Sequence, residues 1–303
     1  MKYPNKVKIV DVGPRDGLQN EVVNISTETK VELIDRLGDA GVKNIEAAAF
    51  VSPKWIPQMA DSHDVMAKIN RRDNIVYSVL TPNMYGYEAA MAAKADEIAI
   101  FGAASETFSR KNINCSISES MLRFKPVCAA AKKAGVPVRG YISCVLGCPY
   151  EGGIAPELVG SVARELKAMG CHEISLGDTV GKGTPRKAQS VIEAVAKHIP
   201  IENIAVHFHD TYGQALANIL AVMEQGVAVI DTAVSGLGGC PYASGASGNV
   251  ASEDVIYMLN GLDIETGINL EQLVETGIFI AKSMGQPSNA KVTRALSGGS
   301  KWV

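Results

Sequence analysis

The chain has 303 residues, of which 47% are hydrophobic and 20% charged, a composition typical of globular α/β proteins rather than of disordered chains. Its 29 basic and 32 acidic residues give a formal charge of -3, which argues against a general binder of nucleic acid or anionic membranes. The apolar stretches fall short of the roughly 20 residues that a membrane span needs. The six cysteines form no Cys-x-x-Cys motif, so neither a disulfide framework nor a structural zinc site is expected. The first residues carry no signal-peptide or presequence pattern, and we expect a cytoplasmic protein.

Apolar runs typical of β-strands alternate with helical patterns along the chain. We expect eight strands, at residues 7–12, 44–48, 75–80, 97–101, 137–143, 173–176, 204–208 and 227–233. Helical periodicity lies between them, at residues 27–40, 84–93, 118–134, 156–169, 184–198 and 213–225. This alternation favours an α/β fold of the (β/α)8 TIM-barrel type, because short parallel connections place helices outside and strands inside. A doubly wound open sheet is the alternative, but residues 12–17 lack its Gly-x-Gly-x-x-Gly turn.

Two further helices are expected after the eighth strand, at residues 252–259 and 270–284. We therefore expect residues 1–303 to form a single TIM-barrel domain, with residues 250–290 as a helical C-terminal appendage. The tail at residues 295–300 is rich in small residues and looks loose.

Unusual polar residues gather where the expected strands end, which in a TIM barrel is the face that carries the active site. They are Arg15, Asp16, Glu46, Arg139, Tyr141, Ser143, Asp178, His207, His209, Asp210 and the glycine-rich loop 236–249. Taken singly, each has a structural explanation: Asp16 could cap a turn, and Asp178 a helix. Glu46 and Arg139 could form a buried ion pair, and Asn249 could close a loop. Their convergence at one end of successive strands favours an active site.

The two histidines of the seventh strand, His207 and His209, share one face because side chains alternate along a strand. They could be hydrogen-bonded core groups. Together with Asp16 and Asn249, however, they offer a mixed nitrogen and oxygen shell. Such a shell suits Mg²⁺ or Mn²⁺, with Co²⁺ and Zn²⁺ as alternatives.

Arg15 and Cys240 are candidates for direct roles in the chemistry. Arg15 would place a fixed positive charge beside the metal, where it could stabilise an enolate or another oxyanion. In the loop 236–249, seven residues around Cys240 are Gly or Ala, the composition of a flexible lid. Cys240 could deliver a proton, respond to oxidation, or be an inert loop thiol.

Three motifs resemble those of the hydroxymethylglutaryl-CoA lyase family, among the metal-dependent TIM-barrel lyases and Claisen-type synthases. They are VGPRDGLQNE at residues 12–21, His-x-His-Asp at residues 207–210, and the loop 238–249, which begins GGCPYA and ends GN. His-x-His with Arg-Asp is typical of the whole superfamily, whereas the cysteine-bearing loop and the GLQNE segment are typical of the lyase. The resemblance extends over nearly the whole chain.

The resemblance implies a divalent-cation-dependent cleavage of (S)-3-hydroxy-3-methylglutaryl-CoA into acetyl-CoA and acetoacetate, as in leucine degradation. It further implies that Asp16, His207, His209 and Asn249 bind the cation. Arg15 would stabilise the enolate, Cys240 would act from the lid, and Glu46 and Asp178 would organise the site. His207 and Asp16 both stay open as the general base.

Other expectations concern ligands and partners. We expect an acyl-CoA substrate, no nucleic acid or membrane partner, and a homo-oligomer, in first place a dimer. Residues 110–112 could meet the coenzyme A phosphates or form a solvated turn. Asp11 stands where some relatives carry Glu. A pyruvate-type aldolase, a 2-isopropylmalate-like synthase and a non-catalytic acyl-CoA-binding barrel are the alternative functions.

Overall fold

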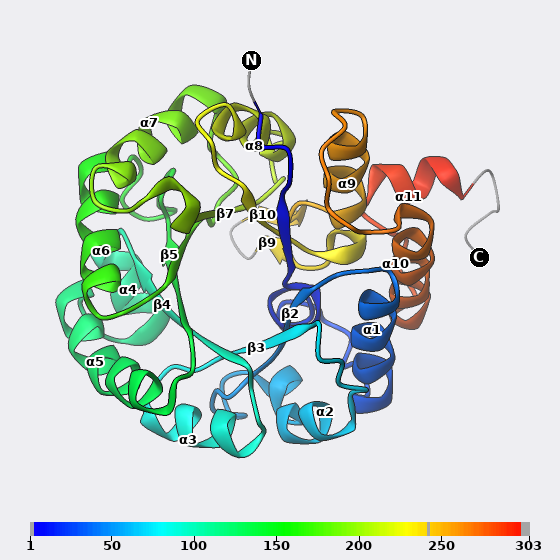
Figure 1. Cartoon of the computed structure of the whole chain (residues 1–303), viewed down its shortest axis with the longest axis horizontal. Helices are drawn as coiled ribbons and strands as arrows, with labels where there is room; N and C mark the ends of the chain where they lie inside the picture. The colour runs from blue at the N-terminus through cyan, green and yellow to red at the C-terminus, as the bar shows by residue number, and fades with distance from the viewer. Residues whose placement is uncertain (1–2, 241–242, 298–303) are drawn as a thin grey trace.

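Eight parallel strands pair edge to edge and close on themselves in the computed structural model, which describes residues 3–240 and 243–297. The strands are β1 (Lys8–Asp11), β2 (Asn44–Ala49), β3 (Val76–Leu80), β4 (Glu97–Ala103), β5 (Val138–Ser143), β6 (Glu173–Asp178), β7 (Ile204–Phe208) and β8 (Val229–Thr232). Figure 1 shows them as the centre of a ring of helices. The predicted (β/α)8 barrel is confirmed, and the open sheet is excluded because β1 pairs with β8.

The connecting helices differ from the prediction mainly where they are short. They are α1 (Thr27–Asp39), α2 (Ser62–Lys68), α3 (Met84–Ala92), α4 (Glu106–Ile113), α5 (Ile117–Ala134), α6 (Pro156–Ala168), α7 (Pro185–Ala196) and α8 (Ala215–Met223). Sequence periodicity missed α2 and α4, which at two turns each are too short to show a clear apolar stripe. None of the described helices has the length and apolar character of a membrane span.

Short helical turns complete the connections. They are η1 (Gly13–Gly17), η2 (Pro57–Met59), η3 (Ile201–Asn203) and η4 (Val234–Gly236). Of these, η1 and η4 directly follow β1 and β8, and they position the backbone beside the mouth of the barrel.

Three helices follow the barrel: α9 (Ser252–Asn260), α10 (Leu270–Met284) and α11 (Lys291–Leu296). In Figure 1 they lie together on one side of the ring, with α10 beside α1. The backbone N–H of Asn269, the N-cap of α10, donates to the Ala40 carbonyl at the end of α1 over 2.8 Å. A Cβ on Gly41 would lie 2.4 Å from the Gly267 carbonyl oxygen, so only glycine permits this approach. The expectation of a loose tail is wrong for Ala295 and Leu296, which end α11; residues 298–300 lie outside the described part of the chain.

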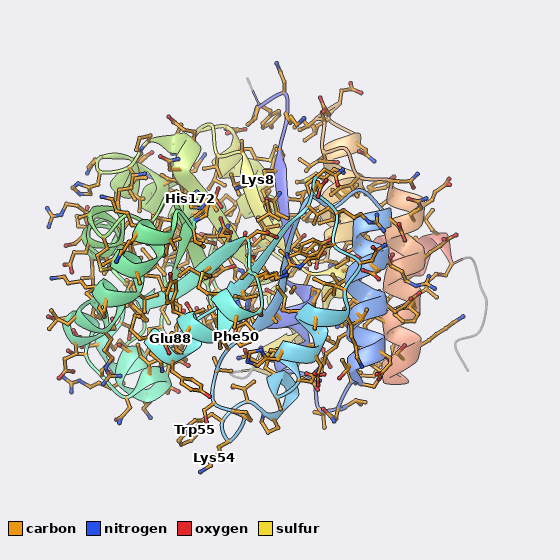
Figure 2. All side chains as sticks on the ribbon, turned by 60° about the horizontal axis from the view of Figure 1, so that its bottom comes forward. Lys8, Phe50, Lys54, Trp55, Glu88 and His172 are labelled. Carbon is orange, nitrogen blue, oxygen red and sulfur yellow. The ribbon has the colours of Figure 1, made fainter. Side chains whose placement is uncertain are left out.

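The two ends of the barrel differ in what they expose. Figure 2 places Lys8 and His172, which precede or begin strands, at one end of the molecule. Lys54 and Trp55, in the segment after β2, lie at the opposite end. This second end is the carboxyl-terminal mouth, where Arg15, Asp16, His207 and His209 lie.

A buried carboxylate fastens the C-terminal helices to the barrel. Glu253 of α9 is fully buried and accepts hydrogen bonds from the Ser235 N–H at 2.9 and 3.0 Å and from Thr293 Oγ1 at 3.1 Å. Burial raises the pKa of its carboxyl to about 8, although the bonds from Ser235 and Thr293 oppose the rise. The native protein therefore favours protonated Glu253 near neutral pH.

We expect Glu253→Gln to flatten the pH dependence of stability. The native state holds this proton up to about pH 8, whereas an unfolded glutamate releases it near pH 4.5. The contribution of Glu253 to the free energy of unfolding is therefore complete below pH 4.5 and is lost as pH rises toward 8, by at most about 1.4 kcal/mol per pH unit. Denaturant unfolding between pH 5 and 8 should show a smaller decline for the variant. The exposed Glu275→Gln on the same C-terminal helices serves as the control; an equal slope for both variants would contradict the prediction.

Candidate metal centre and catalytic cavity

A cavity of about 810 Å³ opens at the carboxyl-terminal mouth of the barrel. Its walls include four of the predicted site residues: Arg15, Asp16, His207 and His209. Apolar and aromatic side chains, among them Trp55, Phe101, Phe108 and Phe124, line other parts of it. A concave cavity in which apolar walls adjoin convergent polar groups is typical of a small-molecule site.

The turn that carries Arg15 and Asp16 is shaped by its glycines. The N–H of Gly13 donates to the Asp11 carboxylate over 2.9 Å, which bends the chain as it leaves β1. At the other end of η1, a Cβ on Gly17 would lie 2.6 Å from the Leu237 Cβ. Glycine at that position lets the segment after β1 pack against the segment after β8, and this packing brings Asp16 toward Asn249.

Three of the four predicted metal ligands form one cluster. Ligand atoms of Asp16, His207 and His209 all lie within 4.8 Å of one another, and His207 Nε2 is 3.7 Å from Asp16 Oδ2. Two atoms bound to one ion at about 2.1 Å can be at most about 4.2 Å apart, so small shifts would let one ion contact all three. Nδ1 of His209 is buried and has no hydrogen-bond partner among the residues that the structure describes, as expected for a side chain that has a ligand to bind. The residues present therefore fit a divalent cation.

The fourth predicted ligand, Asn249, lies beside this cluster. Its Nδ2 donates to Asp16 Oδ2 over 3.0 Å and to the Leu237 carbonyl over 3.2 Å. The backbone of Asn249 also forms a bridge with His209. The amide is thus in reach of the site, and turning it would present its oxygen in place of its nitrogen.

The charge states of the cluster suit metal binding. Burial alone would raise the pKa of the Asp16 carboxyl, but Arg15 and then His207 hold it well below its usual range. Burial, together with the neighbouring His207, lowers the pKa of His209 to about 4. At neutral pH, the site therefore offers an anionic carboxylate and a neutral imidazole, the forms that bind metals.

Arg15 is held between two carboxylates. Its Nη1 donates to Asp16 over 2.6 Å and its Nη2 to Glu46 over 2.8 Å. Burial would lower the pKa of the guanidinium, but Glu46 and Asp16 raise it above its ordinary value. Glu46, which is fully buried, also accepts from the Tyr141 hydroxyl over 3.0 Å. Glu46 thus orients Arg15 from below. The guanidinium of Arg15 is a permanent positive charge at the cavity wall.

The proposed ion pair between Glu46 and Arg139 is wrong. Arg139 lies deeper in the barrel and donates to Glu173 over 2.7 Å and to Asp231 over 2.6 and 3.0 Å. The cation that pairs with Glu46 is instead Arg15. Which buried ions meet depends on the register and tilt of the strands, which composition does not specify.

Asp178 turns away from the cavity. Its Oδ2 accepts from the Gly183 N–H over 2.7 Å and closes the turn after β6, while its neighbours Gly177 and Thr179 line the cavity. The N-cap of α7 is Thr184, so the alternative of a helix cap is wrong, while the role of Asp178 in organising the site stays a prediction. The structure gives Asp178 a loop-closing contact and does not bring its carboxylate to the metal cluster.

The described parts of the glycine-rich loop include two short strands. Strands β9 (Gly239–Cys240) and β10 (Ala243–Ser247) form an antiparallel pair, and Gly248 N–H donates to the Gly238 carbonyl over 2.7 Å. The Cys240 side chain and residues 241–242 lie outside the described residues, so the expected lid and the role of Cys240 stay predictions.

A basic residue reaches the outer part of the cavity. Lys111 and Asn112 both line it, and they belong to the last turn of α4 rather than to the solvated turn considered as an alternative. The Lys111 ammonium lies 4.4 Å from the centre of the Tyr150 ring, a cation–π contact.

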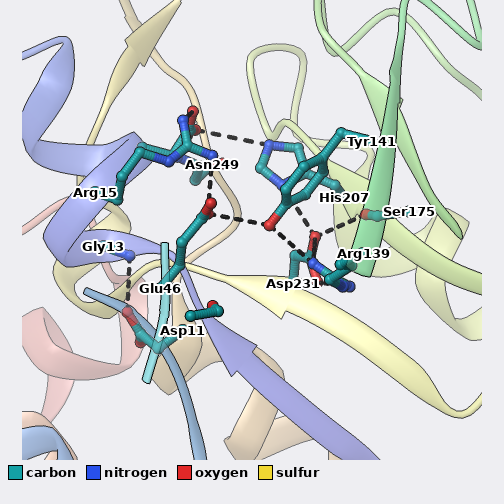
Figure 3. A network of polar contacts seen from close by, with 12 residues as sticks. Asp11, Gly13, Arg15, Glu46, Arg139, Tyr141, Ser175, His207, Asp231 and Asn249 are labelled. Atoms are coloured by element: carbon teal, nitrogen blue, oxygen red, sulfur yellow. Dashed lines mark hydrogen bonds and ion pairs between the residues drawn. The ribbon is translucent and has the colours of Figure 1, made fainter. Parts of the chain in front are cut away.

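Sequence reasoning missed Asp231 of β8. Its Oδ2 lies 3.4 Å from His207 Nδ1 (Figure 3). The signal was an acidic residue inside an otherwise apolar run, since a charged side chain is seldom fully buried unless it is paired. The pattern predicts only a strand there, because nothing in it identifies the partner of the acid.

Comparisons with known proteins agree on one family. A family model described as HMGL-like matches residues 6–280. The chain is 56% identical over 293 residues to a protein of Gallus gallus named mitochondrial hydroxymethylglutaryl-CoA lyase, covering 97% of this chain and 98% of that one. It is 57% identical over 292 residues to a Mus musculus protein named cytoplasmic 3-hydroxy-3-methylglutaryl-CoA lyase, covering 96% and 85%.

Solved structures are similar over the same extent. The crystal structure of hydroxymethylglutaryl-CoA lyase from Pseudomonas aeruginosa has a TM-score of 0.97 and 55% identity, covering 98% of this chain and 99% of that one. An HMG-CoA lyase from Acinetobacter baumannii, in complex with coenzyme A and 3-methylmalate, has a TM-score of 0.92 and 34% identity, covering 97% and 96%.

We expect His209→Ala to weaken Mn²⁺ binding by more than about 100-fold, because it removes one of three clustered ligands, whereas loss of an outer-sphere partner costs 10- to 100-fold. Titration followed by electron paramagnetic resonance of free Mn²⁺ measures this affinity. His198→Ala, which removes an exposed imidazole, should bind like the wild type. Unchanged affinity in His209→Ala would place the ion elsewhere.

Proposed function

This chain belongs to the HMGL-like family, and we propose that it cleaves (S)-3-hydroxy-3-methylglutaryl-CoA into acetyl-CoA and acetoacetate. The observation that carries the proposal is the cluster of Asp16, His207 and His209 with Arg15 beside it, in the wall of one cavity. The names of relatives more than 50% identical over nearly the whole chain support the same reaction.

The proposed cofactor is Mg²⁺ or Mn²⁺, held by Asp16, His207, His209 and Asn249. When bound, such a cation supplies Lewis acidity toward the hydroxyl and carbonyl oxygens of a substrate. The chain itself supplies the anionic and neutral ligands, and Arg15 and Glu46 fix the position of Asp16 and the charge around it.

Arg15 would stabilise the enolate that forms when the carbon–carbon bond breaks. Its guanidinium is fixed at the cavity wall by two charge-assisted hydrogen bonds, so little reorganisation is needed when negative charge develops on the thioester oxygen. Cys240, on the glycine-rich loop, is the proposed source of the proton for the resulting carbanion, as the resemblance implies.

His207 and Asp16 both stay our candidates for the base. In His207 both nitrogens face carboxylates: Nε2 faces Asp16 and Nδ1 faces Asp231. In Asp16 both oxygens accept hydrogen bonds, Oδ1 from Arg15 and Oδ2 from Asn249, so either residue would have to exchange a contact before it accepts a proton.

The whole chain would act as one catalytic domain, with residues 250–290 as its helical appendage. We propose a dimer that binds its acyl-CoA in the cavity, with Lys111 near the entrance available to a phosphate.

Similar proteins are named both mitochondrial and cytoplasmic. We propose the cytoplasm for this chain, and fractionation of expressing cells would test this location.

The decisive experiment incubates purified protein with Mg²⁺ or Mn²⁺ and hydroxymethylglutaryl-CoA. Acetoacetate and acetyl-CoA should appear in equal amounts, and a chelator should abolish both until the cation is restored. Absence of product from protein whose metal content is confirmed by elemental analysis would refute the lyase. Condensation of acetyl-CoA with a 2-oxo acid would instead support the synthase alternative.

We expect Arg15→Met to lower kcat by about 100- to 1000-fold with a smaller change in KM, since a charge aimed at a developing oxyanion acts mainly in the transition state. Steady-state kinetics at saturating cation measure both constants. The exposed Arg186→Met is the control for loss of an arginine. A rise in KM with kcat unchanged would mean that Arg15 only contributes to substrate binding and would contradict the prediction.

A further inference from the structure

We propose that Asp231 is a positioning residue for the cation site: it fixes the ring of His207 so that Nε2 faces the other ligands. The proposal rests on the proposed function in so far as that function requires a cation at this cluster. It assigns a role to a side chain one layer below the cavity, on a strand that contributes none of the predicted ligands.

The pairing of β7 with β8 builds this contact into the barrel. His207 and Asp231 are register partners on these two parallel strands. Register partners in a sheet project to the same face, and both side chains here are turned to the interior of the barrel, where Asp231 is almost fully buried. The imidazole and the carboxylate are therefore side by side because of the backbone, independently of any loop.

The two nitrogens of His207 face different groups. Nδ1 lies 3.4 Å from Asp231 Oδ2, and Nε2 lies 3.7 Å from Asp16 Oδ2. A small rotation of the ring would bring the Nδ1–H into a hydrogen bond with Asp231. With its proton on Nδ1, the ring directs the Nε2 lone pair at the cluster, and a carboxylate acceptor raises the basicity of that lone pair.

The ring is further confined by an aromatic neighbour. Tyr141 and His207 meet edge to face, with ring centres 6.0 Å apart and planes at 82°. Figure 3 shows His207 between Tyr141 and Asp231.

Asp231 is itself immobilised. Arg139 binds both its oxygens, over 2.6 and 3.0 Å, and the Ser175 hydroxyl donates to Oδ2 over 2.7 Å. The carboxylate cannot turn without breaking charge-assisted hydrogen bonds in a site closed to water. Its orientation toward His207 is therefore fixed before any ion binds.

A second acid provides a matched control. Glu173 also binds Arg139, over 2.7 Å, but its other oxygen pairs with Lys8 and not with His207. Removing either acid deprives the same guanidinium of one buried carboxylate. Only the loss of Asp231 also deprives His207 of its partner.

The test compares Asp231→Asn with Glu173→Gln in the full chain. We expect Mn²⁺ affinity, measured by electron paramagnetic resonance, to fall about 10- to 100-fold in Asp231→Asn, the range for the loss of an outer-sphere partner of a ligating histidine. Glu173→Gln should bind Mn²⁺ like the wild type even if its thermal unfolding temperature drops. Equal affinity in the two variants would overturn the proposal and leave Asp231 a purely structural residue.

A second measurement keeps the proposal testable if Asp231→Asn does not fold. Nitrogen-15 NMR of the metal-free wild type should show His207 with its proton on Nδ1. A wild-type proton on Nε2 would contradict the proposal. Both readouts are independent of turnover: loss of Mn²⁺ affinity without any lyase activity would leave this inference standing while the proposed function fails.

Discussion

The closure of the barrel through β1 and β8 is the constraint on which the site depends. Lys8–Asp11 pairs in parallel register with Val229–Thr232, and this brings the turn after the first strand beside the segment that follows the last. Asp16 and Asn249, 233 positions apart, thereby come within 3.0 Å, next to His207 of β7 and to His209, which follows that strand. A sheet that stayed open would leave these groups at opposite edges.

Inside the closed barrel, acidic, basic and hydroxyl side chains contact one another in a closed circuit. Successive contacts join Arg15 to Glu46, Tyr141, Arg139, Asp231, His207, Asp16 and back to Arg15. Figure 3 shows most of this circuit. Ions are costly to bury unless they are paired and hydrogen-bonded, and here each acid has a basic or hydroxyl partner. Burying these charges costs stability, but it fixes their orientation. The side chains at the cavity wall are held by those beneath them before substrate or cation binds.

Membership of the HMGL-like family gives a context for residues that the motifs alone leave unexplained. Arg15, Asp16, His207 and His209 line the cavity together with Tyr141, whereas Arg139 and Asp231 lie beneath and support them. Asp178 shows the opposite case, since it stands in a suggestive sequence position but closes a turn. The position of a polar residue at a strand end predicts that it is near the mouth; the direction of its side chain is a separate property.

The sequence by itself determined the eight strands, the long helices, the carboxyl-terminal mouth and the cluster of Asp16, His207 and His209. These features follow from local periodicity and from residue types whose chemistry is visible one position at a time. Only the tertiary structure decided that Glu46 holds Arg15 rather than Arg139, that Asp178 faces a turn, and that Asp231 stands behind His207. The physical reason is that these contacts depend on register between strands distant in sequence, and a shift of one residue would turn each side chain to the other face.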